Sequence, residues 1–209
     1  MVPPPPTMGV ILAGGLSRRM GGGDKPLLTI GERTLLQCVA ERLTPQCETV
    51  ILNANRNPTR FEGMNLPVVP DSIAGHPGPL AGILAALDWA ATHHEALEWV
   101  VSVPGDTPFI PPDLVQQLQE ARQKAGRPLA CAASGGQVHF AVGLWPVSLR
   151  RDLRRVLVET DMRSIRDWAQ LHGYAQASWP AVPLDPFFNV NRPDDLDHAR
   201  ALAQLEGFR

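Results

Sequence analysis

Apolar residues along this chain follow two alternating patterns, one typical of buried strands and one typical of helices. Short and almost continuous apolar runs are what strands buried on both faces of a parallel sheet require. Longer segments between them carry apolar residues at every third or fourth position, which places those residues on one face of an α-helix. In the first half of the chain, the apolar runs predict strands at residues 8–13, 49–54, 66–69 and 99–103. The helical spacing predicts helices at residues 34–43, 79–92 and 112–124.

The second half of the chain departs from this alternation. Two of its apolar runs are separated only by Ser134, Gly135 and Gly136, which favours a hairpin of antiparallel strands. The elements predicted there are strands at 128–133, 137–145, 174–178 and 187–190, and helices at 148–159, 164–172 and 193–205. Together the elements indicate a Rossmann-like, three-layer α/β fold whose mostly parallel sheet carries an antiparallel insertion in the second half.

Composition indicates how many domains the chain forms and in which cellular compartment we expect it. The chain has 209 residues, of which 44% are hydrophobic and 19% charged, and this fits a single globular domain. We expect that domain to span residues 8–209, and residues 1–7, with four successive prolines, to form a disordered arm. No run approaches the ~18 apolar residues of a membrane span, and residues 1–7 lack the parts of a secretion signal. We therefore expect a cytoplasmic protein whose three cysteines, which form no Cys-x-x-Cys pair, stay reduced.

A glycine-rich, basic loop follows the first predicted strand and is the strongest sign of chemistry in the chain. It runs from Gly14 to Lys25 and contains five glycines, whose backbone N–H groups can approach an anion closely. Arg18, Arg19 and Lys25 add cationic donors for phosphate oxygens. The loop predicts a phosphate site, while the alternative is a flexible surface loop with solvated charges.

The spacing excludes two common kinds of phosphate loop. Lys25 is followed by Pro26 rather than by Ser or Thr, so the loop is not a Walker A motif. The Gly-x-Gly-x-x-Gly fingerprint of dinucleotide-binding folds is also absent from it. The loop therefore favours neither a P-loop ATPase nor a nicotinamide-dependent dehydrogenase.

A carboxylate at the end of another predicted strand is the candidate metal ligand. Parallel strands place their carboxyl ends at one edge of a sheet, and Asp106 follows the buried run 99–103 at that edge. A carboxylate there is either a turn-forming residue or a ligand of Mg²⁺, which commonly bridges bound phosphates. Asp24, next to Lys25, is the rival ligand. We predict that Asp106 holds Mg²⁺, with Mn²⁺ as the alternative ion.

Several short motifs occur along the chain in a fixed order. They are Leu12-Ala13-Gly14-Gly15-x-Ser17-x-Arg19-Met20-Gly21-x-x-Asp24-Lys25, Asn53-Ala54-Asn55-Arg56, Pro70-Asp71, Gly78-Pro79-Leu80-Ala81-Gly82, Asp106-Thr107-Pro108 and Asn189-Val190-Asn191-x-Pro193. The first motif alone marks a wide group of nucleotidyltransferases. The full set resembles the molybdenum cofactor guanylyltransferase (MobA) family, from Val10 to about His198. One departure is Gly105, where relatives often have a cysteine or another small residue.

The resemblance implies a nucleotidyltransferase fold and the transfer of GMP from GTP to molybdenum-molybdopterin, with release of pyrophosphate. The nucleotide-binding residues that it implies are Leu12, Ala13, Gly14, Gly15, Lys25, Asn53, Asp71 and Asp106. In this interpretation Arg19, Lys25 and Asp106 are the catalytic residues, and Asp106 is also the metal ligand. Asn189 and Asn191 fall on the side of the second substrate.

Two other functions stay open at this stage. A transferase of the same fold would use CTP, with molybdopterin or a sugar or isoprenoid phosphate as acceptor, but such relatives tend to carry Ala-Ala-Gly at positions 13–15. A non-catalytic adaptor would deliver the finished cofactor, but the presence of both Lys25 and Asp106 argues against it. The partners that we expect are GTP, molybdopterin, proteins of molybdenum cofactor biosynthesis, and apo-molybdoenzymes or their chaperones. The net charge of −2 favours neither nucleic acid nor a membrane as a partner, and we expect a monomer.

The pterin side is the least defined part of the prediction. We expect the antiparallel segment 128–145 and the helix after it to face the pterin. His139 lies in an apolar run and is interpreted as a packed or pterin-side residue rather than a metal ligand. The basic face formed by Arg150, Arg151, Arg154 and Arg155 is either solvated or directed at an acidic partner or the pterin phosphate.

Overall fold

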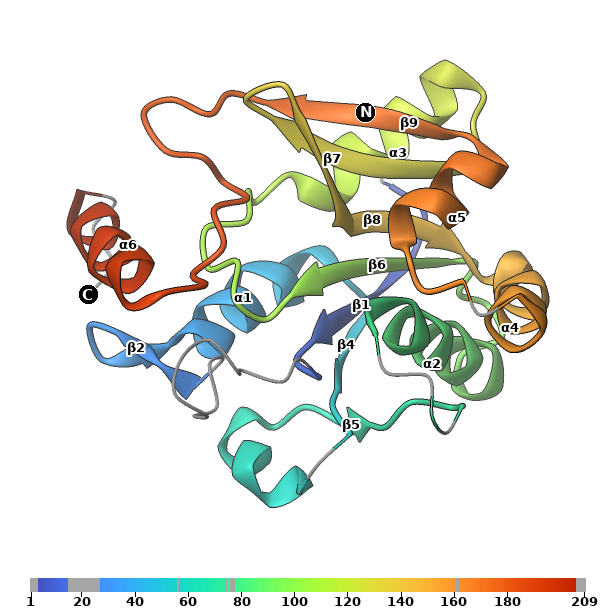
Figure 1. The fold of residues 1–209 in the computed structure, drawn as a ribbon, viewed down its shortest axis with the longest axis horizontal. Helices are drawn as coiled ribbons and strands as arrows, with labels where there is room; N and C mark the ends of the chain where they lie inside the picture. The colour runs from blue at the N-terminus through green and yellow to red at the C-terminus, as the bar shows by residue number, and fades with distance from the viewer. Residues whose placement is uncertain are drawn as a thin grey trace.

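A computed structural model describes residues 4–14, 27–55, 57–73, 75, 78–160 and 162–205. Its centre is a seven-stranded sheet in the order β5-β4-β1-β6-β8-β7-β9, seen in Figure 1. The strands are β1 (Thr7–Leu12), β4 (Thr49–Asn53), β5 (Val68–Val69), β6 (Trp99–Pro104), β7 (Leu129–Ser134), β8 (Gln137–Pro146) and β9 (Tyr174–Trp179). Only β8 pairs antiparallel with its neighbours, β6 and β7, among these described strands. The predicted mostly parallel sheet with an antiparallel insertion is confirmed.

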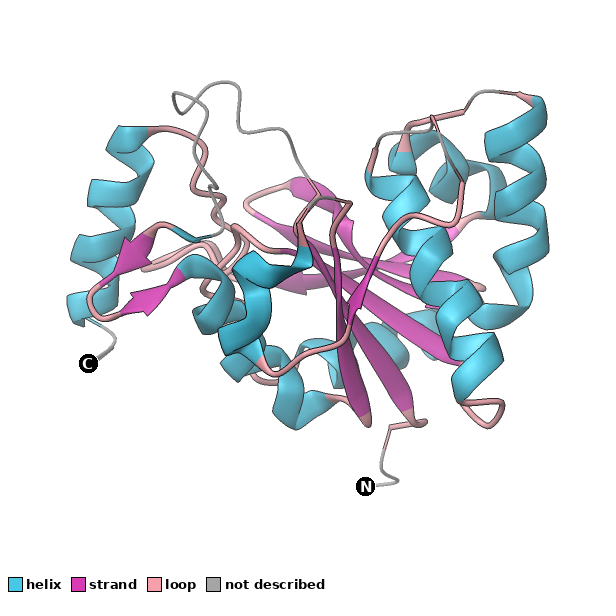
Figure 2. Cartoon of the chain, turned by 90° about the horizontal axis from the view of Figure 1, so that it is seen from below, coloured by secondary structure: helices cyan, strands magenta, loops and turns pink. Residues whose placement is uncertain are grey.

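Helices cover both faces of the sheet, and the alternation of side chains along the strands explains why. In β1, Val10 packs with one buried cluster and Ile11 with another, because successive strand residues point to opposite faces. The Ile11 face is covered by α1 (Leu35–Leu43) and α3 (Leu114–Ala125). The Val10 face is covered by α2 (Pro79–His93), α4 (Arg150–Glu159) and α5 (Ile165–His172). Figure 2 shows this three-layer arrangement.

A smaller hydrophobic cluster joins the last helix to the loop after β6. The short hairpin of β2 (Thr29–Ile30) and β3 (Arg33–Thr34) packs against α6 (Pro193–Leu205). Phe109 and Val190 are buried in the same cluster. The packing fixes the segment before α6 beside the loop that follows β6, and Figure 1 shows α6 next to β2.

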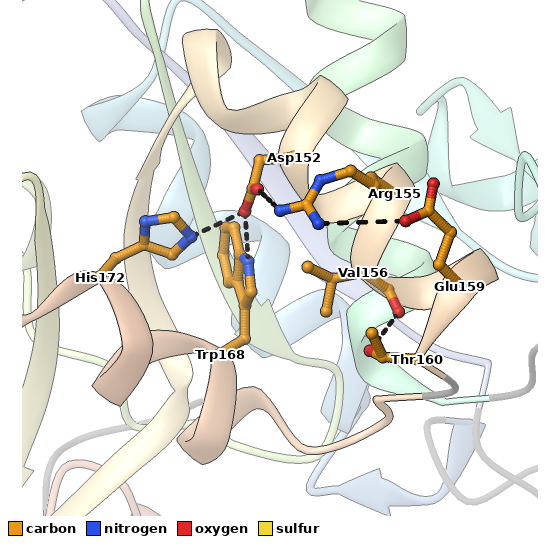
Figure 3. Close-up of polar contacts among 7 residues, drawn as sticks. All are labelled: Asp152, Arg155, Val156, Glu159, Thr160, Trp168 and His172. Carbon is orange, nitrogen blue, oxygen red and sulfur yellow. Dashed lines mark hydrogen bonds and ion pairs between the residues drawn. The ribbon is translucent and has the colours of Figure 1, made fainter.

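Polar groups also tie α4 to α5, as Figure 3 shows. One oxygen of Asp152 accepts a hydrogen bond from Arg155 at 2.6 Å, and the other lies 2.9 Å from His172 Nε2 and 3.4 Å from Trp168 Nε1. Burial alone would raise the pKa of Asp152, but the hydrogen bonds from Arg155, His172 and Trp168 outweigh burial and lower it. The carboxylate therefore stays ionised and holds the two helices together.

The structure corrects the prediction in one place and extends it in others. The strand predicted at 187–190 is wrong, because these residues form a turn and loop. The Phe187 and Phe188 N–H groups donate to the side chain and carbonyl of Asp185, so neither is left for a sheet ladder. Sequence patterns also missed the β2–β3 hairpin and the 3₁₀ helix Pro58–Met64. None of the helices in the described ranges is long and apolar enough to cross a membrane.

Candidate active site

The carboxyl ends of four neighbouring strands meet at one edge of the sheet, as predicted. Backbone hydrogen bonds continue across this edge beyond the strands themselves. They run from Ala13 N to Asn53 O at 2.9 Å, from Ala54 N to Val69 O at 3.2 Å, and from Gly105 N to Leu12 O at 3.0 Å. The chain crosses from the β4 side of β1 to the β6 side, so β1 and β6 flank a switch point, where open α/β sheets bind ligands. The described residues that directly follow β1, β4, β5 and β6 therefore lie around one site.

Two asparagines from β4 and its loop hold the carboxylate of Asp71, which follows β5. Asn53 Nδ2 donates to Asp71 Oδ1 at 3.0 Å, and Asn55 Nδ2 donates to Asp71 Oδ2 at 2.7 Å. The Asp71 N–H returns a bond of 2.8 Å to Asn55 Oδ1. We call these three residues the asparagine clasp. Asn53 is the last residue of β4 and Asn55 lies in the loop after it, yet both side chains reach the same carboxylate.

The start of α2 is shaped to fit the asparagine clasp. A methyl group at Gly82 would lie 2.3 Å from Asn53 Oδ1 and 2.9 Å from Leu12 Cδ2, so only glycine fits between them. The helix also begins at this edge with Pro79 at its first position and no acidic side chain in its first turn. A helix N-terminus of this kind favours a negatively charged ligand nearby.

The first nucleotide-binding motif is described only in part. The Leu12 carbonyl and the Ala13 N–H both serve the ladder across the edge, so a bound nucleotide would use other backbone groups of this segment. A methyl group at Gly14 would lie 3.8 Å from both Asn53 Oδ1 and Asn55 Nδ2, so the loop begins beside the asparagine clasp. The predicted site residues Gly15, Arg19 and Lys25 lie outside the described residues.

Asp106 stands directly after β6, and the late segment, residues 187–191, is anchored around it. The carboxylate is partly buried, and its Oδ1 atom is shielded from solvent. The Asp106 carbonyl accepts a hydrogen bond of 3.0 Å from Val190 N. Next to it, the buried Thr107 hydroxyl donates to Asn189 Oδ1 at 2.6 Å. Asn189 and Asp106, far apart in the sequence, are therefore neighbours at the site.

Asn191 lies at the end of the late segment, where α6 begins. Its side-chain amide bonds back to the Asn189 carbonyl at 3.4 Å. The backbone N–H groups of Asn191 and Arg192 both donate to Asp195 Oδ2 at 2.8 Å. The two asparagines predicted on the second-substrate side are thus brought together next to Asp106.

Asp106 fits a divalent cation better than Asp71 does. Each Asp71 oxygen already accepts a hydrogen bond from an asparagine amide, so this carboxylate is engaged in the asparagine clasp. Within the described ranges, no three histidine, cysteine or acidic side chains form a group that would enclose a metal by themselves. Mg²⁺ needs no such group, since it usually binds one or two carboxylates together with substrate phosphates and water. A single carboxylate at a phosphate-binding edge suits this chemistry.

Sequence reasoning missed several groups at this edge. It gave no role to Asn55, Gly82 or Thr107, although all three lie in motifs that it had singled out. It also gave no joint role to Ser134, His139 and Asp185, which hydrogen-bond to one another. Only the recurrence of asparagine at positions 53 and 55, at the end of a predicted strand, could have indicated a shared partner from the sequence alone.

Most arginines on the basic face of α4 form ion pairs with carboxylates of the same molecule. Arg154 Nη2 lies 2.6 Å from Asp88 Oδ2 on α2, and Arg150 Nη1 lies 3.7 Å from Asp88 Oδ1. The Ser72 hydroxyl donates to the same Asp88 at 2.8 Å. These contacts tie α4 and α2 to the residue after Asp71, which gives the basic face a structural role.

Comparisons with known proteins identify the family of this chain. The model of the MobA-like NTP transferase domain matches residues 9–174. The molybdenum cofactor guanylyltransferase of Nitrobacter hamburgensis is 54% identical over 97% of both chains, and that of Bradyrhizobium sp. is 52% identical over 95% of this chain and 93% of the relative. In fold, the crystal structure of molybdopterin-guanine dinucleotide biosynthesis protein A from Archaeoglobus fulgidus superposes with a TM-score of 0.72, at 24% identity, over 95% of this chain and 99% of that chain. The chain thus belongs to the molybdenum cofactor guanylyltransferase family, whose members share the MobA-like NTP transferase domain.

Proposed function

We propose that this protein transfers the GMP part of GTP to the terminal phosphate of molybdenum-molybdopterin and releases pyrophosphate. The observation that carries the proposal is the convergence of the asparagine clasp, Asp106 and Asn189 on the switch-point edge of a sheet from the guanylyltransferase family. In the reaction, an oxygen of the pterin phosphate forms a bond to the α-phosphorus of GTP. The bond from that phosphorus to the β-phosphate oxygen breaks, and its electron pair leaves with pyrophosphate.

The residues act by positioning and by neutralising charge. The attacking oxygen is already an anion, so the reaction needs no strong general base. The asparagine clasp lies beside the start of the glycine-rich loop, and in this proposal it holds the base or ribose end of GTP. Lys25 and Arg19, with the backbone of their loop, steady the leaving pyrophosphate in this proposal. Holding both substrates in line removes much of the entropic cost of bringing them together.

Asp106 is the residue that would hold Mg²⁺, or Mn²⁺ in its place. Such an ion, when bound, offsets the negative charge that accumulates where two phosphate groups meet. Asp106 suits this part because it lies between the phosphate-loop strand β1 and the late segment. Its backbone bond to Val190 keeps the carboxylate in register with Asn189 and Asn191.

Pyrophosphate release provides the direct test. The purified protein with Mg²⁺, GTP and molybdenum-molybdopterin should release pyrophosphate and form a product whose mass corresponds to the guanine dinucleotide. Neither GTP alone nor the pterin alone should give release. Faster turnover with CTP than with GTP would overturn the choice of nucleotide. Tight binding of both substrates without any pyrophosphate would indicate a delivery adaptor instead of an enzyme.

A further inference from the structure

A hydrogen-bonded cluster of one buried and two half-buried residues lies at the same sheet edge, beyond Asp106. It consists of Ser134 at the end of β7, His139 near the start of β8, and Asp185, and we call it the serine cluster. Ser134 Oγ lies 2.7 Å from Asp185 Oδ1 and 2.7 Å from His139 Nε2. Ser134 is only 4% exposed, so these bonds are made away from bulk water. Because β7 runs parallel to β6, the end of β7 lies on the same edge as the end of β6.

The hydrogen bonds in the serine cluster have a defined direction. An ionised carboxylate only accepts hydrogen bonds, so the single Ser134 hydroxyl hydrogen goes to Asp185. Ser134 Oγ is then the acceptor toward His139, which must carry a hydrogen on Nε2. Burial lowers the pKa of His139, although the nearby Asp185 opposes this effect. The neutral ring therefore keeps its hydrogen on Nε2 and leaves Nδ1 as an acceptor.

A bulge in β8 brings His139 to this place. Cys131 pairs with Gly143, but the next residue, Ala132, pairs with His139, so three residues of β8 have no partner opposite them on β7. If the pairing of Cys131 with Gly143 continued without a bulge, His139 would lie opposite Gly135, in the hairpin turn. The buried Ser102 of β6 stabilises the bulge, since its hydroxyl donates to the Ala141 carbonyl at 2.8 Å. Bulges of this kind often re-aim side chains near active sites.

The serine cluster also holds the late segment, residues 187–191. Asp185 Oδ1 accepts a second hydrogen bond, of 2.9 Å, from Phe187 N. The Phe187 ring is buried between His139, at a centroid distance of 5.0 Å, and Trp179, at 5.2 Å. Two residues later the chain reaches Asn189, which accepts from Thr107, and then Val190, which donates to Asp106. One carboxylate oxygen thus connects the β7–β8 hairpin to the neighbourhood of Asp106.

We propose that Ser134, His139 and Asp185 are positioning residues that set the late segment against Asp106 and so determine the geometry of the acceptor side. The inference rests on the proposed function, because it takes Asn189 and Asn191 to lie toward the acceptor. The serine cluster acts through these residues and touches neither GTP nor the reacting phosphates. Its loss should weaken binding of the acceptor and leave the asparagine clasp and GTP binding intact.

Two substitutions at Asp185 separate positioning from charge. Asp185→Ala removes both hydrogen bonds and should raise the KM for molybdopterin by roughly tenfold or more, while the KM for GTP stays within about twofold. Asp185→Asn should restore most of the affinity, because one amide oxygen can accept from both Ser134 and Phe187. Asp167→Ala is the matched control, because it also replaces an aspartate by alanine but at an exposed position on α5. If Asn is as harmful as Ala, the negative charge itself is required and positioning is wrong.

A structural readout keeps the inference independent of turnover. The ¹⁵N spectrum of the histidine rings, with His139 assigned by comparison with His139→Gln, should show the neutral ring protonated on Nε2. Ser134→Ala should change that signal, and Ser178→Ala, a serine exposed on β9, should not. A ring protonated on Nδ1 would overturn the inference even in an active enzyme. An inactive protein with the expected spectrum would instead refute the proposed function and leave the serine cluster as a structural device.

Discussion

The asparagine clasp and the serine cluster lie at the same sheet edge but are built in different ways. The asparagine clasp is formed by residues at the ends of two adjacent parallel strands, and each Asp71 oxygen has its own asparagine. The serine cluster joins a hairpin to a loop some fifty positions away, and a single oxygen of Asp185 accepts both of its hydrogen bonds. Regular parallel pairing therefore builds the proposed nucleotide side, whereas a bulge and a long-range contact build the proposed acceptor side.

The two regions also differ in the structure that each requires. Strand order brings the ends of β4 and β5 together, and the asparagine clasp then needs only local side chains at those ends. The serine cluster needs the three extra residues of β8 and a correctly placed Asp185. The proposed acceptor side thus depends on more irregular structure than the proposed nucleotide side does.

The largest effect should come from the residue between the two regions. Asp106→Asn keeps the size of the side chain but removes its charge, and with it the proposed metal ligand. We expect turnover to fall by roughly 10²–10³, the usual loss when one preorganised charge partner is removed. The melting temperature should stay close to that of the unchanged protein. Pyrophosphate release with Mg²⁺ measures the effect, and near-normal turnover would refute the metal role.

A glycine substitution should damage the nucleotide side selectively. Gly82→Ala puts a methyl group 2.3 Å from Asn53 Oδ1, so Asn53 must move and its bond to Asp71 must weaken. We expect destabilisation of about 1–3 kcal/mol, as for other overpacked sites. GTP binding measured by calorimetry should weaken by roughly tenfold, equivalent to about 1.4 kcal/mol.

Gly63→Ala is the matched control for that substitution. A methyl group there meets no described atom within 4 Å, and the residue lies in the 3₁₀ helix Pro58–Met64, away from the asparagine clasp. It should change neither GTP affinity nor stability appreciably. Equal GTP affinity in the two variants would mean that Asn53 does not depend on the space at Gly82.

The same contrast explains how much the sequence could predict. Apolar runs located β1, β4 and β6 within a residue or two, because strands buried on both faces leave a strong pattern. The rule for parallel strand ends then brought Asn53, Asp71 and Asp106 together correctly. The strand expected at 187–190 failed because Asp185 accepts the N–H groups of Phe187 and Phe188 and so fixes a turn there, which a short apolar run cannot reveal.

The bulge was equally hidden from sequence reasoning. The run 137–145 reads as one continuous strand, and nothing in its pattern marks the three residues without a partner. Ser102, which supports the bulge, stands in a buried strand and resembles any small residue in such a run. Predicting the serine cluster would have required the register of β8 on β7, which depends on contacts with a third strand.

Ser102 offers a way to disturb the acceptor side from within the core. Ser102→Ala removes the hydroxyl that donates to the Ala141 carbonyl and accepts from Trp145 Nε1, at 2.8 Å each. Two buried polar groups would lose their partner, which should lower the free energy of unfolding by about 1–3 kcal/mol. Urea denaturation measures this change, with the exposed Ser178→Ala as control. Unchanged stability would mean that the bulge is held by backbone packing alone.

The smallest expected effect is a change in how the free energy of unfolding depends on pH, and it comes from His139 in the serine cluster. Burial keeps the pKa of His139 below its usual 6.5, so the folded protein binds this proton less readily than the unfolded chain does. The stability from neutral His139 is complete above about pH 6.5 and is lost as the pH falls from there toward the lowered pKa. One proton limits the slope to about 1.4 kcal/mol per pH unit.

His139→Gln should remove this contribution, because glutamine keeps an N–H donor for Ser134 and does not titrate. Urea denaturation at several values between pH 5 and 7 should therefore give a flatter pH dependence for the variant than for the unchanged protein. Asp152 does not interfere, since its pKa is lowered below 3.8 and its own contribution is lost only at more acidic pH. Parallel slopes for the two proteins would mean that burial does not lower the pKa of His139 in the folded protein.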